Sequence, residues 1–213
     1  MDKESAVQLI VDCLEAFKIR YFDPIPEAGD ENNTDIYFVS TEMDNSPEGF
    51  IETTITFCED CLLARAYYSV NGQKLVSANL ERFPALFRLF NFINEEKNHI
   101  AIQKQSRFDG DERKAAIFSP QLRMTEDGEH SIKYQLIVDY SYFELFPNET
   151  AQMLLLFLQL YLNEFAISVF GVLTGKMSLK EAKKNIVSIA HKEMPFPSNY
   201  RTLIEEDDEY ECI

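Results

Sequence analysis

Apolar residues along this chain recur in blocks of two kinds, some with a helical period and some with the two-residue period of strands. In the first block Val7, Ile10 and Leu14 are three and four residues apart. This spacing predicts an amphipathic helix that starts after a Ser5 cap and fades near Arg20. The chain therefore begins with a helix that buries one apolar stripe.

Strand-like segments follow the first helix. They are rich in β-branched and aromatic side chains and comprise residues 36–40, 50–57 and 62–70. The polar residues 23–34 contain Asp-Pro-Ile-Pro and predict a loop, because proline lacks a backbone donor and restrains its predecessor. Only Cys58-Glu59-Asp60-Cys61 separates the last two strands, which predicts a tight hairpin. Asn71-Gly72 predicts a further turn.

A second helix and more strands are predicted in the middle of the chain. Leu and Phe residues between 80 and 93 follow a helical spacing, with Pro84 in the first turn and the end near Asn94. Alternating residues predict short strands around 100–102 and 116–118. Residues 131–141 alternate most clearly, which is typical of an antiparallel sheet with one buried face. Their inward residues are predicted to be Ile132, Tyr134, Leu136, Val138 and Tyr140.

The longest apolar segment, residues 149–173, predicts a helix capped by Asn148. It is long enough to span a membrane, but Gln159 and Asn163 interrupt it and no basic cluster precedes it. We therefore expect a helix buried between the sheet and a second partner. Ser178-Leu179-Lys180-Glu181 predicts a capping box that begins one more short helix.

These elements predict an α+β fold in which helices flank one antiparallel sheet. The predicted order is α-β-β-β-α-β-β-α, with an extra C-terminal helix. We expect residues 1–193 to form a single domain and residues 194–213 to form a proline-containing acidic tail. With 46% apolar residues, including 17 Phe and 10 Tyr, the chain can bury a large core.

The net charge of −16 is distributed unevenly, since residues 1–60 hold 15 of the 36 acidic side chains and 3 of the 20 basic ones. Nucleic acids and anionic lipids attract Lys and Arg, so we expect neither nucleic acid nor membrane as a partner. The acidity either serves solubility or forms an acidic face for a basic partner. The N-terminus lacks a basic stretch followed by an apolar core and a cleavage site, so we expect a cytoplasmic protein.

Cys58 and Cys61 are the most conspicuous candidates for chemistry. A redox pair normally lies at a helix N-terminus, whereas strand-like sequence flanks this pair on both sides. Zinc needs four ligands, and the pair supplies two. We interpret the cysteines as structural, with metal binding and redox chemistry as the alternatives. No phosphate-loop or nucleophile motif occurs, so no catalytic residue, cofactor or metal ligand is predicted.

Several stretches between about Ile51 and Ala182 resemble the YbjN-type family, whose fold is like that of type III secretion chaperones. They are the paired strands ITFCEDCLLARAYYSV, the helix FPALFRLFNFINEE with Asn91 and Asn94 near its end, the strand SIKYQLIVDYS and the closing FAISVFGVLTGKMSLKEA. The resemblance implies an α+β sandwich, frequent dimers and a role in binding or regulating proteins. It implies no active-site residue.

We therefore expect a non-enzymatic, chaperone-like or regulatory module that binds another protein or peptide and can form a homodimer. Such a module binds along a sheet edge or in a helix-lined groove, because both offer unpaired backbone or apolar surface. Two alternatives stay open: an enzyme whose active site no motif reveals, and a zinc protein that uses Cys58 and Cys61. The anchors of the core or dimer interface are predicted to be Phe87, Phe90, Leu156, Leu160 and Phe170.

Overall fold

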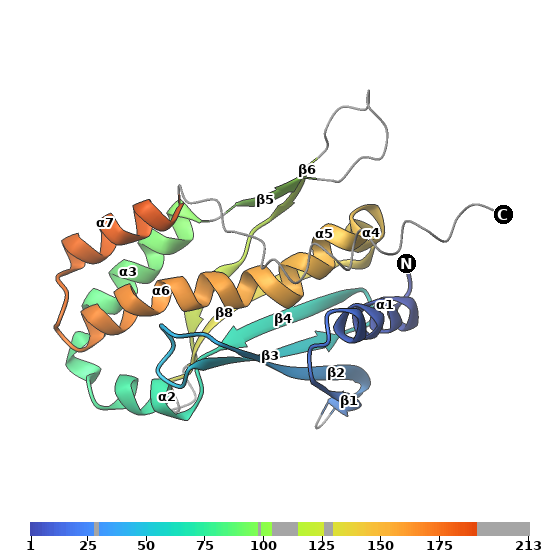
Figure 1. The fold of residues 1–213 in the computed structure, drawn as a ribbon, viewed down its shortest axis with the longest axis horizontal. Coiled ribbons are helices and arrows are strands. Elements are labelled where there is room, and N and C mark those ends of the chain that lie inside the picture. The colour runs from blue at the N-terminus through green and yellow to red at the C-terminus, as the bar shows by residue number, and fades with distance from the viewer. Residues whose placement is uncertain (28–29, 98, 104–114, 126–129, 191–213) are drawn as a thin grey trace.

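A six-stranded antiparallel sheet forms one layer of the protein and helices form the other (Figure 1). The computed structural model describes residues 1–27, 30–97, 99–103, 115–125 and 130–190. The strand order is β1-β2-β3-β4-β8-β7, and β5 pairs with β6 in a separate two-stranded ribbon. The strands are β1 (Tyr21–Glu27), β2 (Asp30–Thr41), β3 (Phe50–Phe57), β4 (Cys61–Tyr67), β5 (Ile100–Gln103), β6 (Ala115–Phe118), β7 (Gln121–Met124) and β8 (Ile132–Asp139).

Helices begin the chain, connect the strands and complete the described part. They are α1 (Lys3–Ala16), α2 (Val70–Ser77), α3 (Phe83–Glu96), α4 (Tyr140–Leu145), α5 (Pro147–Gln152), α6 (Leu158–Leu173) and α7 (Leu179–Ala190). A 3-10 turn at Leu80–Arg82 precedes α3, and a π-helical turn at Met153–Phe157 joins α5 to α6. The predicted α+β class with an antiparallel sheet is thus confirmed. The predicted element order has five strands where the described residues form eight: it lacks β1 and two of the four strands between α3 and α4, and it also lacks the short helices α2 and α4.

The prediction of a loop over residues 23–34 is wrong, because β1 and β2 occupy most of this range. Both prolines lie in β1, at the edge of the sheet. An edge strand tolerates proline, since the missing N–H need not have a partner in the ladder. The pairing of β1 with β2 also shifts register between Phe22 and Ile25. The prolines therefore mark an edge strand and not the absence of a strand.

The prediction of a turn at Asn71-Gly72 is also wrong, because both residues lie in α2. Gly72 is present in this helix because there is no room for a side chain. A Cβ atom at this position would lie 2.5 Å from the Cβ of Tyr68, which is fully buried. The Tyr68 hydroxyl donates a hydrogen bond to the Leu162 carbonyl at 2.5 Å, so the ring cannot easily move aside.

Replacing Gly72 with alanine is expected to lower the free energy of unfolding. Alanine favours a helix by about 1 kcal/mol, but overpacking a fixed neighbour costs about 1–3 kcal/mol. The middle of that cost less the helix gain is a net loss of about 1 kcal/mol, measured by urea unfolding. The control is Ser77→Ala in the same helix at an exposed position, which should change stability by less than about 0.5 kcal/mol. A Gly72→Ala variant as stable as the parent would contradict the tight contact.

The N-terminal helix begins earlier than predicted. Its cap is Asp2 and not Ser5: the Asp2 carboxylate accepts a hydrogen bond from the Ser5 N–H at 2.8 Å. This bond to Ser5 lowers the pKa of Asp2. The helix ends at Ala16 and not near Arg20, and Lys18 adopts a left-handed conformation with φ of 55°. A carboxylate is favoured at this place because the first N–H groups of a helix lack partners.

The long apolar segment forms three helical pieces. Asn148 is not the cap, since Phe146 holds that position and Pro147 occupies the first turn, where proline needs no hydrogen bond. Tyr140 begins α4 and does not extend β8. The stretch Pro147–Leu173 has the length and hydropathy of a membrane span, but 78% of its most apolar window is buried inside the protein. A core helix has the same properties, so this stretch is only weak evidence for a membrane.

Two local predictions are confirmed in atomic detail. In the hairpin between β3 and β4, the Cys58 N–H donates to the Cys61 carbonyl at 2.9 Å. In the capping box before α7, Ser178 N–H donates to the Glu181 carboxylate at 2.9 Å, and Glu181 N–H donates to the Ser178 hydroxyl at 3.3 Å. The predicted tail at 194–213 lies outside the described residues.

The core lies between the sheet and the helices. The predicted inward residues of β8, Ile132, Tyr134, Leu136 and Val138, are all buried. Helix α6 packs on this face, where Phe165 meets the Tyr134 ring edge-on at 5.5 Å. Gln159 also donates a hydrogen bond to the Thr53 hydroxyl of β3 at 2.9 Å. These contacts hold the helical layer on one side of the sheet, and the other side faces solvent.

Candidate functional site

The side of the six-stranded sheet that faces away from the helical layer is named the open face. Its side chains are half-buried or exposed, apart from Thr56. Two large apolar side chains on it are strongly exposed, Phe22 at 65% and Ile137 at 64%. Strand register aligns its residues in three rows: Phe22-Tyr37-Thr54-Arg65-Gln135-Gln121, Asp35-Thr56-Leu63-Ile137 and Val39-Glu52-Tyr67-Lys133-Arg123.

Polar side chains connect the middle of the open face. The Arg65 guanidinium donates to the Thr56 hydroxyl at 3.4 Å, and the Thr54 and Tyr67 hydroxyls are also 3.4 Å apart. Burial and a hydrogen bond to Glu52 raise the pKa of Tyr37, so this tyrosine is neutral at physiological pH. Arg65 makes no ion pair with any described residue. Its charge therefore remains available to a partner.

Both edges of the six-stranded sheet are closed to further strands. Edge strand β1 contains Pro24 and Pro26, which lack the N–H group that a new strand needs. At the other edge, the Asn94 side chain of α3 binds the backbone of Leu122 in β7. Leu122 N–H donates to Asn94 Oδ1 at 2.7 Å, and Asn94 Nδ2 donates to the Leu122 carbonyl at 3.1 Å. The asparagine thus takes the place of a neighbouring strand.

The β5–β6 ribbon has one edge closed in the same way. Ile117 N–H in β6 donates to the Tyr142 hydroxyl at 2.6 Å, and that hydroxyl donates to the Ile117 carbonyl at 2.9 Å. The Tyr142 ring also meets Phe118 edge-on at 5.7 Å. Helix α4 therefore covers the outer edge of β6. The sequence suggested neither contact, because each joins residues more than 20 positions apart.

Cys58 and Cys61 lie at the two ends of the predicted hairpin turn. Burial raises the pKa of the Cys61 thiol, and the neighbouring Cys58 raises it further. Redox chemistry and metal binding both require the thiolate, which a raised pKa disfavours. Among the described residues, no three His, Cys, Asp or Glu side chains are grouped closely enough to hold a metal ion. The zinc alternative would therefore need ligands from outside the described residues, and bound zinc is measurable by elemental analysis.

Buried titratable groups occur between α3 and α6. Lys97 has its Nζ 4.9 Å from the centre of the Tyr161 ring, and burial lowers the pKa of Lys97. The hydroxyl of Tyr134 in β8 is buried and has no hydrogen-bond partner among the described residues. Perturbed groups can mark an active site, but burial accounts for the lowered pKa of Lys97. The enzyme alternative gains no support from this group.

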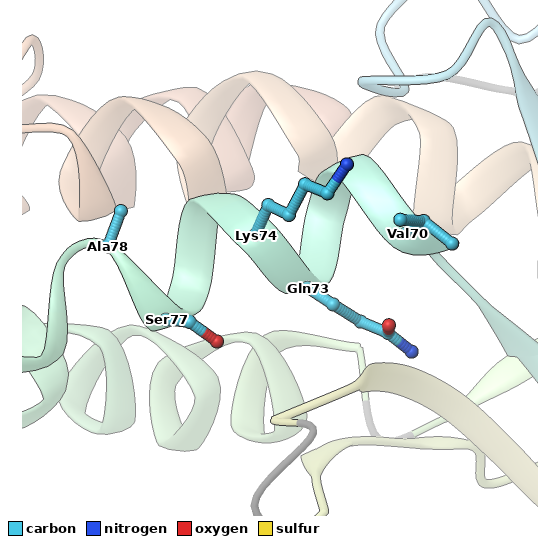
Figure 2. Close-up of a pocket in the computed structure, with 5 residues that line it drawn as sticks. All are labelled: Val70, Gln73, Lys74, Ser77 and Ala78. Atoms are coloured by element: carbon cyan, nitrogen blue, oxygen red, sulfur yellow. The ribbon is translucent and has the colours of Figure 1, made fainter.

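A surface hollow lies along α2, where Figure 2 shows four residues of this helix and Ala78, which follows its last residue. The Gln73 amide already donates to the Ser131 hydroxyl at 2.7 Å. Lys74 supplies the only charge in the lining, which consists of Val70, Gln73, Lys74, Ser77 and Ala78. A shallow hollow with one lysine offers little selectivity, since binding sites usually combine enclosure with several convergent polar groups.

The five predicted anchors do not form one interface. Phe90 and Leu156 are buried in the core, whereas Leu160 and Phe170 are half-buried against it. Phe87 is 46% exposed and packs edge-on against Phe90. The exposed apolar residues of the open face were absent from the prediction. Ile137 faces away from the inward residues of β8, and that alternation could have identified it.

Comparisons of this chain with models of protein families, with curated proteins and with solved structures found no match. The resemblance to the YbjN-type family therefore stays a prediction.

Proposed function

We propose that the protein is a non-enzymatic protein-binding module whose open face is the contact surface. The observation that carries this proposal is the exposure of Phe22 and Ile137 on a regular sheet face. Large apolar side chains on such a face lose contact with water when a partner binds, which is the main driving force of association. Tyr37 and Tyr67 add aromatic area beside them, and tyrosine is enriched in interfaces.

The charges of the open face indicate what kind of partner it fits. Asp35 and Glu52 lie on β2 and β3, whereas Arg65, Lys133 and Arg123 lie on β4, β8 and β7. A partner surface with the opposite arrangement would be complementary. A second copy of the chain, related by a two-fold axis parallel to the strands, has that arrangement. The homodimer is therefore one partner that we propose, beside a different protein.

The order of elements supports the proposed likeness to type III secretion chaperones. Strands β2, β3 and β4 form a meander, helices α2 and α3 follow, and β8 returns to pair with β4. A long buried helix then packs on the sheet. The role that we propose for this contact surface is chaperone-like or regulatory, in the cytoplasm. This likeness concerns architecture and names no partner.

The proposal is tested by a charge placed on the open face. Tagged full-length protein is expressed in its native host and cross-linked, and captured chains are quantified by mass spectrometry. Ile137→Asp is expected to reduce recovery of the main partner, or of a second copy, by about tenfold, because central apolar contacts dominate binding. The control is Leu145→Asp in α4, since Leu145 is 63% exposed and lies away from the open face. Equal recovery with both variants would refute the open face as the contact surface.

A further inference from the structure

We propose that the free edge of β5 binds one extended peptide segment of a partner protein, which adds a third strand to the β5–β6 ribbon. This inference rests on the proposed protein-binding function and assigns a second site with its own partner chemistry. The ribbon projects from the body of the protein, beside the layer of helices (Figure 1). One face of the ribbon is already buried, with the side chains of Ile100, Ile102, Ala116 and Phe118, so a third strand would extend an anchored sheet.

The hydrogen bonds of Ile117 determine which way β5 directs its backbone. Both backbone groups of Ile117 bond to the Tyr142 hydroxyl, so they face away from β5. Ala101 is the direct partner of Ile117 in the antiparallel pairing. In such a ladder, two opposite residues either bond to each other or both face outward. Ala101 therefore directs its N–H and its C=O to the free side of β5.

This edge differs from the other strand edges of the protein. Strand β1 contains two prolines, which lack the N–H group. The Asn94 side chain binds the backbone at the edge of β7, and the Tyr142 hydroxyl binds the backbone at the edge of β6. No side chain among the described residues makes the corresponding bonds to Ala101. Ala101 itself is exposed to solvent. Among the described residues, three strand edges are thus closed against strand addition, and the β5 edge is left able to accept a strand.

The surroundings of Ala101 define the chemistry of the incoming segment. Its backbone must be extended and must offer an N–H and a C=O to Ala101. The residue that comes to lie opposite Ala101 has its side chain on the face of the ribbon that carries Ile117, which is 55% exposed. An apolar, β-branched residue fits this position, since cross-strand apolar pairs stabilise sheets. We therefore infer a partner segment with a β-branched residue at its centre and no proline.

The test uses a displayed library of random peptides about nine residues long, selected against the full-length protein. We expect enriched peptides to carry a central β-branched residue and to bind the Ala101→Pro variant at least tenfold more weakly, because proline removes the outward N–H. Methylation of the central peptide amide should weaken binding to the unchanged protein by a similar factor. That second measurement does not depend on whether Ala101→Pro folds.

The matched control is Ala101→Thr, which keeps the N–H and should bind the peptides within about threefold of the parent. Unchanged affinity for a folded Ala101→Pro variant, or insensitivity to amide methylation, would overturn the β5 site. A second library, with proline at every second position, is the negative control. If the random library yielded no more binders than this control library, the β5 site would also be overturned. Ile137→Asp should leave peptide binding intact, so failure of the open face and failure of β5 are distinguishable.

Discussion

Replacing Phe165 with alanine is expected to lower the free energy of unfolding by about 3–5 kcal/mol, the range for a buried phenylalanine in a packed core. Phe165 is fully buried in α6. Its ring meets Tyr134 of β8 edge-on at 5.5 Å and stacks with Tyr161 at 6.0 Å. Removing it leaves a cavity between the two layers, because Tyr134 and Tyr161 are themselves held by packing.

The measurement is equilibrium unfolding in urea, with the transition followed by far-UV circular dichroism and tyrosine fluorescence. The control is Ile167→Ala, two residues further along α6, where the side chain is 46% exposed. That variant should lose no more than about 1 kcal/mol, because little buried surface is removed. A Phe165→Ala loss as small as that of Ile167→Ala would show that α6 is not packed on β8 as described.

Replacing Asn94 with alanine is expected to cost about 2–4 kcal/mol, although the side chain is only half-buried. Two backbone groups of Leu122 would lose their partners, and each unsatisfied group costs about 1–3 kcal/mol where water cannot replace the bond. The variant would also expose the edge of β7. An exposed strand edge can pair with the same edge of another molecule. We therefore expect the variant to self-associate at concentrations where the molecular mass of the parent protein does not change.

Asn91→Ala is the matched control, since Asn91 lies one turn earlier in α3 and is exposed. It should change the free energy of unfolding by less than about 0.5 kcal/mol. Urea unfolding measures the loss of stability, and light scattering after size-exclusion chromatography measures the self-association. If Asn94→Ala gave the same result as Asn91→Ala in both measurements, Asn94 would not be the side chain that closes the β7 edge.

Sequence periodicity predicted the elements whose environment is asymmetric. Strand β8 was predicted together with its inward face because buried and exposed residues alternate along it. The helix α3 was predicted with Pro84 in its first turn for a similar reason. Periodicity failed for β1, where proline suggested a loop, and for α2, where Asn71-Gly72 suggested a turn. In both cases the tertiary structure overrode the local preference. Strand β1 lies at the edge of the sheet, where proline is tolerated, and Gly72 of α2 packs closely against Tyr68.

The candidate sites were less predictable than the fold. The conspicuous pair Cys58 and Cys61 was placed correctly in a hairpin, but its raised thiol pKa comes from burial that only folding produces. The sequence predicts that Asn94 lies near the end of a helix, but it gives no reason for an asparagine there. Its role depends on Leu122, 28 residues away in the sequence. No spacing rule connects an amide on a helix with a strand edge across the sheet.

By itself, the order of apolar and polar residues determined that the chain forms helices and an antiparallel sheet, which side of β8 is buried and where the last helix is capped. These properties depend on neighbours within a few positions, so a linear pattern records them. Only the tertiary structure decided which face of the sheet stays uncovered, which strand edges are closed and that Ala101 is left with outward backbone groups. Those properties depend on hydrogen bonds and packing between distant segments, and the energy of such contacts has no trace in local periodicity.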